Sequence, residues 1–279
     1  MLFIAAFVAV FLALWVLFFF IGPLLERLLA RSANFTARFR YRDYLPVFVV
    51  LAAGIGLGIV AGDAFLDLAE GLQEDSPRMH AVDRDVHDWA LDTRTPVSTF
   101  FLTILTIIGT PAGLGVLVAI AAALLALRKR WRWGAYLIVT CGIGGLLNLQ
   151  LKAFFARARP DLAEALRDAH GYSFPSGHAM GSTIVFGAFA YLAFRILTRW
   201  RPRAAALAFC CAMILAICAS RIYLGVHWIS DVAAGIAAGA IWLASATVAY
   251  ETFRRIRLVR ALRTRADQTA SSSRTSRGA

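Results

Sequence analysis

Three short clusters of polar residues interrupt a largely apolar chain of 279 residues. They are Lys152-x6-Arg159-Pro160, Pro175-Ser176-Gly177-His178 and Ser220-Arg221-x5-His227-x3-Asp231. Together they supply three cations, two histidines, one carboxylate and a Ser-Gly turn. Transfer of a phosphoryl group requires that its negative charge be neutralised and that nucleophile and leaving group lie in line. The side chains of the three clusters therefore suit covalent chemistry on a phosphate group.

The third cluster contains a histidine and a carboxylate four residues apart. If this segment is helical, the side chains of His227 and Asp231 lie on one face. The carboxylate can then accept the Nδ1 hydrogen of His227, fix the tautomer and leave Nε2 free to attack phosphorus. A His–Asp pair that only caps a helix has the same spacing, so the pair alone leaves both interpretations open.

Three cations are candidate phosphate ligands. Arg221 stands at the end of an apolar segment, and a guanidinium can donate two hydrogen bonds to phosphate oxygens. An arginine that only reaches toward the membrane surface would look the same in the sequence. Lys152 and Arg159 are seven residues apart, about two turns of a helix, so a continuous helix would direct both side chains the same way.

The second cluster directly precedes an apolar segment, where a helix N-terminus is expected. Such an N-terminus presents unpaired backbone N–H groups and the positive end of the helix dipole to an anion. Gly177 would allow close approach to the anion, and Ser176 would cap the helix or donate to the anion. His178 would give a proton to the leaving oxygen. A histidine that only begins a helix at the membrane interface is the alternative for this cluster alone.

Each cluster falls at the end of a long apolar segment. The chain is 59% hydrophobic with a mean hydropathy of +0.66, and segments of about 20 apolar residues can cross a bilayer core of about 30 Å. We expect seven spans: 1–22, 45–65, 99–127, 133–151, 179–197, 204–219 and 232–252. The sequence thus predicts an all-α fold, a polytopic transmembrane helical bundle. We expect its first span to be a retained helix and not a cleaved signal peptide.

The distribution of basic residues predicts the orientation of the chain. Net charge is +12, and 21 of the 29 Lys/Arg lie in four alternate segments: 23–44, 128–132, 195–203 and the tail after 252. Basic segments of membrane proteins face the cytoplasm. The N-terminus and all three clusters would therefore lie on the outer face of the cell membrane, with the C-terminus inside. A basic excess arranged in this way indicates a membrane protein and no nucleic-acid partner.

Two polar regions outside the clusters have expected structures. The stretch 82–91, within connection 66–98, predicts an amphipathic helix on the outer surface. A metal site made by His87 and nearby aspartates is the less favoured interpretation of the same residues. Residues 254–265 predict a basic helix at the cytoplasmic lipid surface, and 266–279 a disordered end.

Small residues at a spacing of four predict close helix packing. Gly54, Gly58 and Gly62 form one such stripe, and Gly235 and Gly239 form another. We favour packing within the chain over dimerisation, and the oligomeric state stays open.

The three clusters together resemble the pattern of the type 2 phosphatidic acid phosphatase (PAP2) superfamily, which includes membrane lipid phosphatases and soluble vanadium haloperoxidases. All eleven specified positions of that pattern are met, and the resemblance covers about residues 45–252. It implies a six-helix phosphatase core, to which 1–22 adds a further helix. The chain is then divided into an N-terminal helix and basic loop (1–44), a phosphatase domain (45–252) and a basic tail (253–279).

The resemblance also implies a role for each residue. His227 would be the nucleophile that forms a phosphohistidine, Asp231 would orient it, and His178 would be the general acid. The phosphate ligands would be Lys152, Arg159, Ser176, Gly177 and Arg221. The resemblance implies no metal and no other cofactor.

We therefore expect a lipid phosphatase of the cell membrane that hydrolyses a phosphomonoester or a pyrophosphate of a lipid. A phosphotransferase that passes the phosphate to another lipid or a sugar is the first alternative. A non-catalytic lipid-binding protein is the second, although such a protein would not need both His178 and His227. The sequence does not distinguish phosphatidate, phosphatidylglycerophosphate and undecaprenyl pyrophosphate as substrates. Connections 66–98 and 160–174 flank the site and are expected to select the head group, but they contain no motif that identifies it.

Overall fold

A computed structural model of the chain describes residues 45–160, 165–166 and 170–275. Within these residues the protein consists of helices and contains no strand, which confirms the all-α prediction. The helices are α2 (Leu45–Gln73), α3 (Pro77–Asp92), α4 (Pro96–Ile108), α5 (Pro111–Leu127), α6 (Trp131–Phe155), α7 (Gly177–Ile196), α8 (Trp200–Tyr223) and α9 (Ile229–Thr275). The predicted span 1–22 and the basic loop 23–44 lie outside the described residues.

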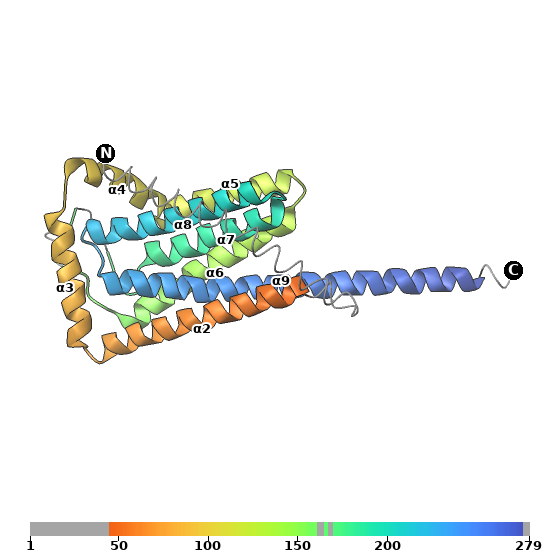
Figure 1. The fold of residues 1–279 in the computed structure, drawn as a ribbon, viewed down its shortest axis with the longest axis horizontal. Helices are drawn as coiled ribbons and strands as arrows, with labels where there is room; N and C mark the ends of the chain where they lie inside the picture. Colours follow the sequence, from red (N-terminus) through yellow and green to blue (C-terminus); the bar gives the residue numbers. More distant parts are fainter. Residues whose placement is uncertain (1–44, 161–164, 167–169, 276–279) are drawn as a thin grey trace.

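The long helices form a bundle that spans a membrane several times. Helices α6, α7, α8 and the Ile229–Arg254 part of α9 are each long and apolar enough to cross a bilayer, and α4 and α5 together make a fifth candidate. Figure 1 shows these helices side by side, with α2 packed along α9. The arrangement confirms the prediction of a multi-pass transmembrane helical bundle.

The expected span 99–127 is divided into two helices. It consists of α4 and α5, which are bent by 57° relative to each other. Thr110 accepts a hydrogen bond from the backbone of the first turn of α5 at 3.0 Å, and Pro111 begins that helix. A Cβ on Gly109, at the break, would lie 3.0 Å from Cδ2 of His178. The bend therefore brings the end of α4 against the start of α7.

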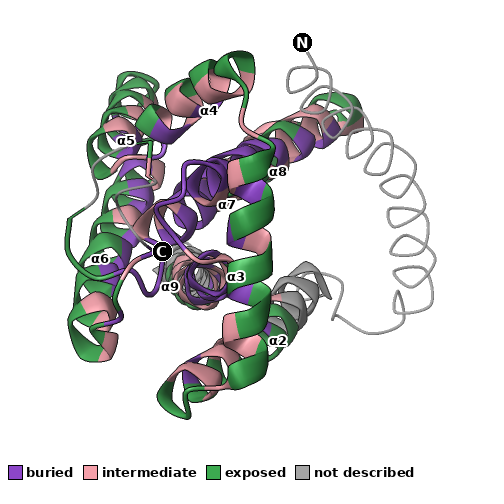
Figure 2. Ribbon diagram, turned by 90° about the vertical axis from the view of Figure 1, so that its left-hand side faces the viewer, coloured by how far each residue is buried: buried purple, intermediate pink, exposed green. Residues whose placement is uncertain are grey.

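Helix α7 is the centre of the bundle. Figure 2 shows that α7 and the neighbouring α8 and α9 carry much of the buried surface, whereas α2, α5 and α6 expose more of theirs. Contact between α7 and α9 is close, because a Cβ on Gly235 would lie 2.7 Å from the carbonyl oxygen of Ser176. A Cβ on Gly239 would likewise lie 2.9 Å from the carbonyl oxygen of Met180. These glycines hold together the starts of the two helices that carry the second and third clusters.

Packing within the chain explains part of the other glycine stripe. A Cβ on Gly54 would lie 2.8 Å from Cγ2 of Val248 on α9. A Cβ on Gly58 or Gly62 would meet no atom of the described residues within 4 Å. Within the described part of the chain, Gly54 is thus the member of this stripe at which a larger residue would crowd α9.

Helix α3 lies across the end of the bundle, as Figure 1 shows. It is the amphipathic helix expected after the second span. Its buried residues are Asp83, His87 and Ala90, whereas Asp85 and Asp88 are exposed. The buried face of α3 is thus partly polar, and it contacts α8 and α9.

Helix α9 is longer than the sequence suggests. Residues 254–265 are helical as predicted, but the helix continues to Thr275 where we expect a disordered end from residue 266. The chain offers no glycine or proline between Gly239 and Gly278 to end the helix, and its Ala and Arg residues favour helix. Residues 276–279 lie outside the described part.

Candidate active site

The three clusters meet at the end of the bundle that α3 covers. Helices α6 and α8 end there, and α7 and α9 begin there (Figure 1). The connection after α6 carries Arg159, and the short connection between α8 and α9 carries His227. All eight candidate residues lie at this end, linked by hydrogen bonds, short contacts or electrostatic interactions.

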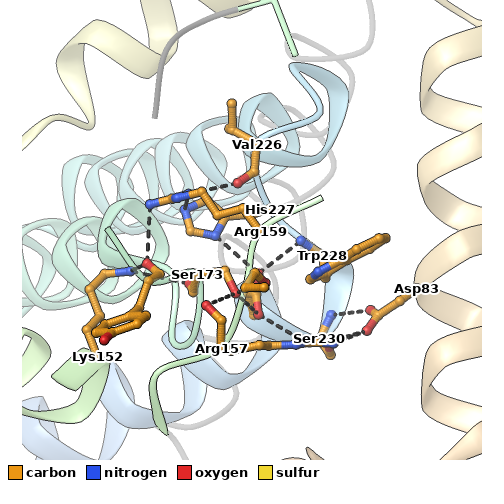
Figure 3. A network of polar contacts seen from close by, with 12 residues as sticks. Asp83, Lys152, Arg157, Arg159, Ser173, Val226, His227, Trp228 and Ser230 are labelled. Carbon is orange, nitrogen blue, oxygen red and sulfur yellow. Dashed lines mark hydrogen bonds and ion pairs between the residues drawn. The ribbon is translucent and has the colours of Figure 1, made fainter. Parts of the chain in front are cut away.

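His227 and Asp231 form the expected pair, although His227 precedes the helix. Nδ1 of His227 lies 3.2 Å from Oδ2 of Asp231, which is in the first turn of α9. The same Oδ2 accepts the backbone N–H of Trp228 at 3.0 Å. Both side chains are buried, and Figure 3 shows His227 beside Arg159 and Trp228. The carboxylate therefore caps the helix and orients the imidazole at once, so the two interpretations of this spacing are not exclusive.

The contact with Arg159 assigns the tautomer of His227. Nη1 of Arg159 lies 3.1 Å from Nε2 of His227. A guanidinium can only donate, so Nε2 must accept and its lone pair is present. The ring hydrogen then sits on Nδ1 and is donated to Asp231. This is the neutral form that a histidine nucleophile requires.

Lys152 and Arg159 converge without the continuous helix that the spacing suggested. Helix α6 ends at Phe155, and Ala156 takes a left-handed conformation with φ of 47°. Nζ of Lys152 donates to the carbonyl oxygen of Tyr172 at 2.6 Å. Nε of Arg159 donates to the carbonyl oxygen of Gly171 at 3.0 Å. Both cations are therefore held by the backbone just before the second cluster.

Arg221 is buried in the last turn of α8. Its Nη1 donates to the hydroxyl of Thr106 on α4. An arginine that reaches toward the membrane surface would be exposed, so that alternative does not fit.

Two side-chain atoms of the second cluster lack hydrogen-bond partners within the part of the chain that the structure describes. Oγ of Ser176 and Nε2 of His178 are buried and have no hydrogen-bond partner among the described residues. Ser176 does not cap α7 with its side chain, which leaves the expected donation to an anion open. A Cβ on Gly177 would lie 2.9 Å from Oδ1 of Asn148 and 3.7 Å from Cε of Lys152. Gly177 is thus required for close packing on α6.

The electrostatics of the site keep His227 neutral. Burial lowers the pKa of His227 well below its ordinary value of 6.5, and the positive charges of Arg159, Arg221 and Lys152 lower it further. The same positive charge would attract a phosphate. One arrangement of cations therefore favours both a neutral His227 and the binding of an anion.

Comparison with known proteins identifies the family. A model of the PAP2 superfamily matches residues 133–255. The chain is also 31% identical over 179 residues to phosphatidylglycerophosphatase B of Bacillus subtilis (strain 168), which is 63% of this chain and 85% of that protein. The chain belongs to the PAP2 superfamily.

A second curated protein and a solved structure are also similar to the chain. A lipid A 1-phosphatase of Rhizobium johnstonii is 38% identical over 116 residues, which is 38% of this chain and 43% of that relative. The crystal structure of a transmembrane PAP2 type phosphatidylglycerolphosphate phosphatase from Bacillus subtilis superposes with a TM-score of 0.65 at 27% identity. It covers 70% of this chain and 96% of that one. The protein is accordingly a phosphoric ester hydrolase of the PAP2 type.

The PAP2 site contains partners that sequence reasoning missed. Arg157 donates to Oδ1 of Asp231 and to Oδ2 of Asp83, each at 2.7 Å, and Ser230 lies between them (Figure 3). Arg157 is two residues before Arg159, so its place in the first cluster was a usable signal. Asp83 is far away in the chain, and only its spacing with the buried His87 and Ala90 on α3 could have suggested that it faces inward.

The metal interpretation of α3 has no support in its geometry. The ring of His87 lies 5.4 Å from that of Trp228, so it faces the connection before α9. No group of three or more His, Cys, Asp or Glu among the described residues is arranged to hold a metal ion.

Proposed function

We propose that this PAP2 protein is an integral-membrane lipid phosphatase that hydrolyses a phosphomonoester or pyrophosphate of a lipid through a phosphohistidine on His227. One observation carries the proposal: Nε2 of His227 accepts a hydrogen bond from Arg159 while Nδ1 faces Asp231. A lone pair suited to attack phosphorus is thereby held among cations that would bind the phosphate.

The phosphate would be bound by Lys152, Arg159 and Arg221. Their charges neutralise the non-bridging oxygens as the phosphoryl group is transferred. The hydroxyl of Ser176 and the N–H groups that begin α7 would donate to the same oxygens. The unsatisfied Oγ of Ser176 is the feature that supports this role.

The reaction would occur in two steps. Nε2 of His227 attacks phosphorus, the bond from phosphorus to the lipid oxygen breaks, and that oxygen leaves with a proton from Nε2 of His178. Water then attacks the phosphorus, the P–N bond breaks, and His178 takes up the proton of the water. Inorganic phosphate leaves and His227 regains its lone pair. The buried Nε2 of His178, without a protein partner in the described part of the chain, supports its role in both steps.

A cavity beside the site would hold a hydrocarbon chain of the lipid. Its volume is about 580 Å³, and Gly177 and Asn148 line it next to the site. From there it extends between α5, α6 and α7 along apolar residues such as Val118 and Ile138. The phosphate would enter at the membrane surface while the chain stays in apolar surroundings. The distribution of basic residues favours the outer surface.

The direct test is phosphate release by the purified protein in detergent. Substrates would be phosphatidate, phosphatidylglycerophosphate, undecaprenyl pyrophosphate and lipid A 1-phosphate, the second and fourth chosen because relatives are named for them. We expect His227→Ala to abolish release from the preferred lipid. His80→Ala, on α3 and bonded to Asp75, is the matched control and should retain activity. Equal release by wild type and His227→Ala would refute the mechanism, and labelled phosphate trapped on an added alcohol would indicate transfer in place of hydrolysis.

A further inference from the structure

A buried line of charges connects α3 to the carboxylate beside His227. Arg157 donates from Nη2 to Asp83 on α3 and from Nη1 to Asp231 on α9, at 2.7 Å in both cases. The three side chains are only 7%, 2% and 0% exposed, in the order Arg157, Asp83 and Asp231. Buried ions are tolerated only in well-defined geometry. The position of Arg157 is therefore fixed by its two carboxylate partners.

Asp83 is itself held on both oxygens. Its Oδ1 accepts the backbone N–H of Ser230 at 3.0 Å, and its Oδ2 accepts the hydroxyl of Ser230 at 2.7 Å. Nη1 of Arg157 donates to the same hydroxyl at 2.7 Å. Because the guanidinium is planar and rigid, holding Nη2 against Asp83 also sets the position of Nη1.

The two oxygens of Asp231 connect Arg157 to His227. Oδ1 accepts Nη1 of Arg157, and Oδ2 lies 3.2 Å from Nδ1 of His227. Together with the backbone N–H of Trp228, which Oδ2 accepts, the bond from Arg157 restricts rotation of the carboxylate and keeps Oδ2 directed at the imidazole. Figure 3 shows the sequence of contacts from Asp83 to His227.

We propose that Asp83 and Arg157 are positioning residues for the reaction: Asp83 holds Arg157, and Arg157 fixes the carboxylate that orients His227. The proposal rests on the role of His227 as nucleophile. It makes α3 part of the catalytic apparatus, since this helix supplies a group on which the imidazole's orientation depends. Neither Asp83 nor Arg157 is among the proposed phosphate ligands.

The first test compares Asp83→Asn with Asp85→Asn on the exposed face of the same helix. Displacement of catalytic groups by an ångström can cost about a hundredfold in rate. We expect Asp83→Asn to lower kcat by about ten- to a hundredfold with little change in KM, because phosphate binding is untouched. Asp85→Asn should behave as wild type. A kcat for Asp83→Asn within about twofold of the Asp85→Asn control would overturn the proposal.

A double-mutant cycle separates positioning from a purely structural role of the ion pair. If Asp83 acts through Asp231, adding Asp83→Asn to Asp231→Asn should lower kcat by less than about threefold, because the interaction is already lost. Multiplicative losses would show that Asp83 acts independently and would refute the inference. If Asp83→Asn does not fold, Arg157→Lys serves in the same cycle, since a lysine keeps the charge but cannot bridge two carboxylates.

The His227→Ala variant distinguishes a failure of the proposed function from a failure of the positioning role alone. Activity that survives in His227→Ala would remove the proposed function and this inference together. Loss of activity in His227→Ala, combined with wild-type kcat in Asp83→Asn and Arg157→Lys, would leave the proposed function intact and refute the positioning role alone. Thermal unfolding of each variant in detergent ensures that kcat is compared between folded proteins.

Discussion

At the scale of single residues, Arg159 joins the two requirements of the site. Its guanidinium donates to backbone carbonyls before the second cluster and to Nε2 of His227. The same charge that would bind phosphate thus keeps the imidazole neutral. As the proposed nucleophile, His227 would thereby stay usable in mildly acidic conditions, since a protonated His227 has no lone pair at Nε2.

The first prediction concerns the pH dependence of kcat/KM. Because burial and nearby cations hold the pKa of His227 below 6.5, the loss of activity on acidification should occur below that pH in wild type. Arg159→Gln removes one of the cations, so the pKa of His227 should rise and the acid limb should move to higher pH. Arg159→Lys retains the charge and should leave the limb near its wild-type position.

Profiles of kcat/KM between pH 4 and 9, measured with one substrate for all three proteins, test this. Both variants are expected to lose rate, so the informative quantity is the position of the limb. A limb that stays in place or moves to lower pH in Arg159→Gln would contradict the assignment of His227 as the titrating group.

Spacing in the sequence predicted the site residues that lie close together in the chain, but not those that the fold brings in from a distant helix. Asp231 could be predicted because it is four residues from His227 and local geometry brings the two together. Asp83 reaches the same network only because α3 folds back over the end of the bundle, which no local spacing encodes. Lys152 and Arg159 do lie close together, but not on one continuous helix as their spacing suggested, because the left-handed Ala156 ends the helix between them.

At the scale of elements, close packing of α7 on α9 aligns two of the clusters. The backbone N–H of Ser176 donates to the carbonyl oxygen of Asp231 at 2.9 Å, next to the contact made by Gly235. The glycine stripe predicted this packing. The bend between α4 and α5 was also encoded, by Thr110 and Pro111, but it was obscured by the apolar residues on both sides.

We expect Gly235→Ala to impair both stability and activity. Its Cβ would lie 2.7 Å from a backbone carbonyl oxygen of α7, and such overpacking costs about 1–3 kcal/mol. Separation of α7 from α9 would also displace Ser176 from Asp231. The control is Gly58→Ala, where the added Cβ meets no atom within 4 Å. Thermal unfolding and kcat of both variants in detergent test this, and equal behaviour of the two would contradict the packing argument.

At the scale of the whole molecule, the bundle places a polar site at one end and an apolar cavity beside it. The apolar segments predicted the bundle, whereas its orientation in the membrane, inferred from the positive charges, stays a prediction. The cavity could not be predicted, because it depends on how far α5, α6 and α7 stand apart and on glycines whose faces only the packed structure defines. Gly145 is one of these: it lines the cavity, and a Cβ there would meet no atom within 4 Å among the residues that the structure describes.

Filling the cavity should therefore affect long lipids selectively. Gly145→Leu adds a side chain where the hydrocarbon chain would lie, and even one methylene in an apolar pocket can change discrimination by about tenfold. We expect kcat/KM for a long-chain lipid phosphate to fall by about tenfold, while that for para-nitrophenyl phosphate, which has no such chain, stays near wild type. Gly56→Leu, on α2 and likewise open, is the control. Equal losses with both substrates would mean that Gly145→Leu disturbs the phosphate site and that the cavity does not select the chain.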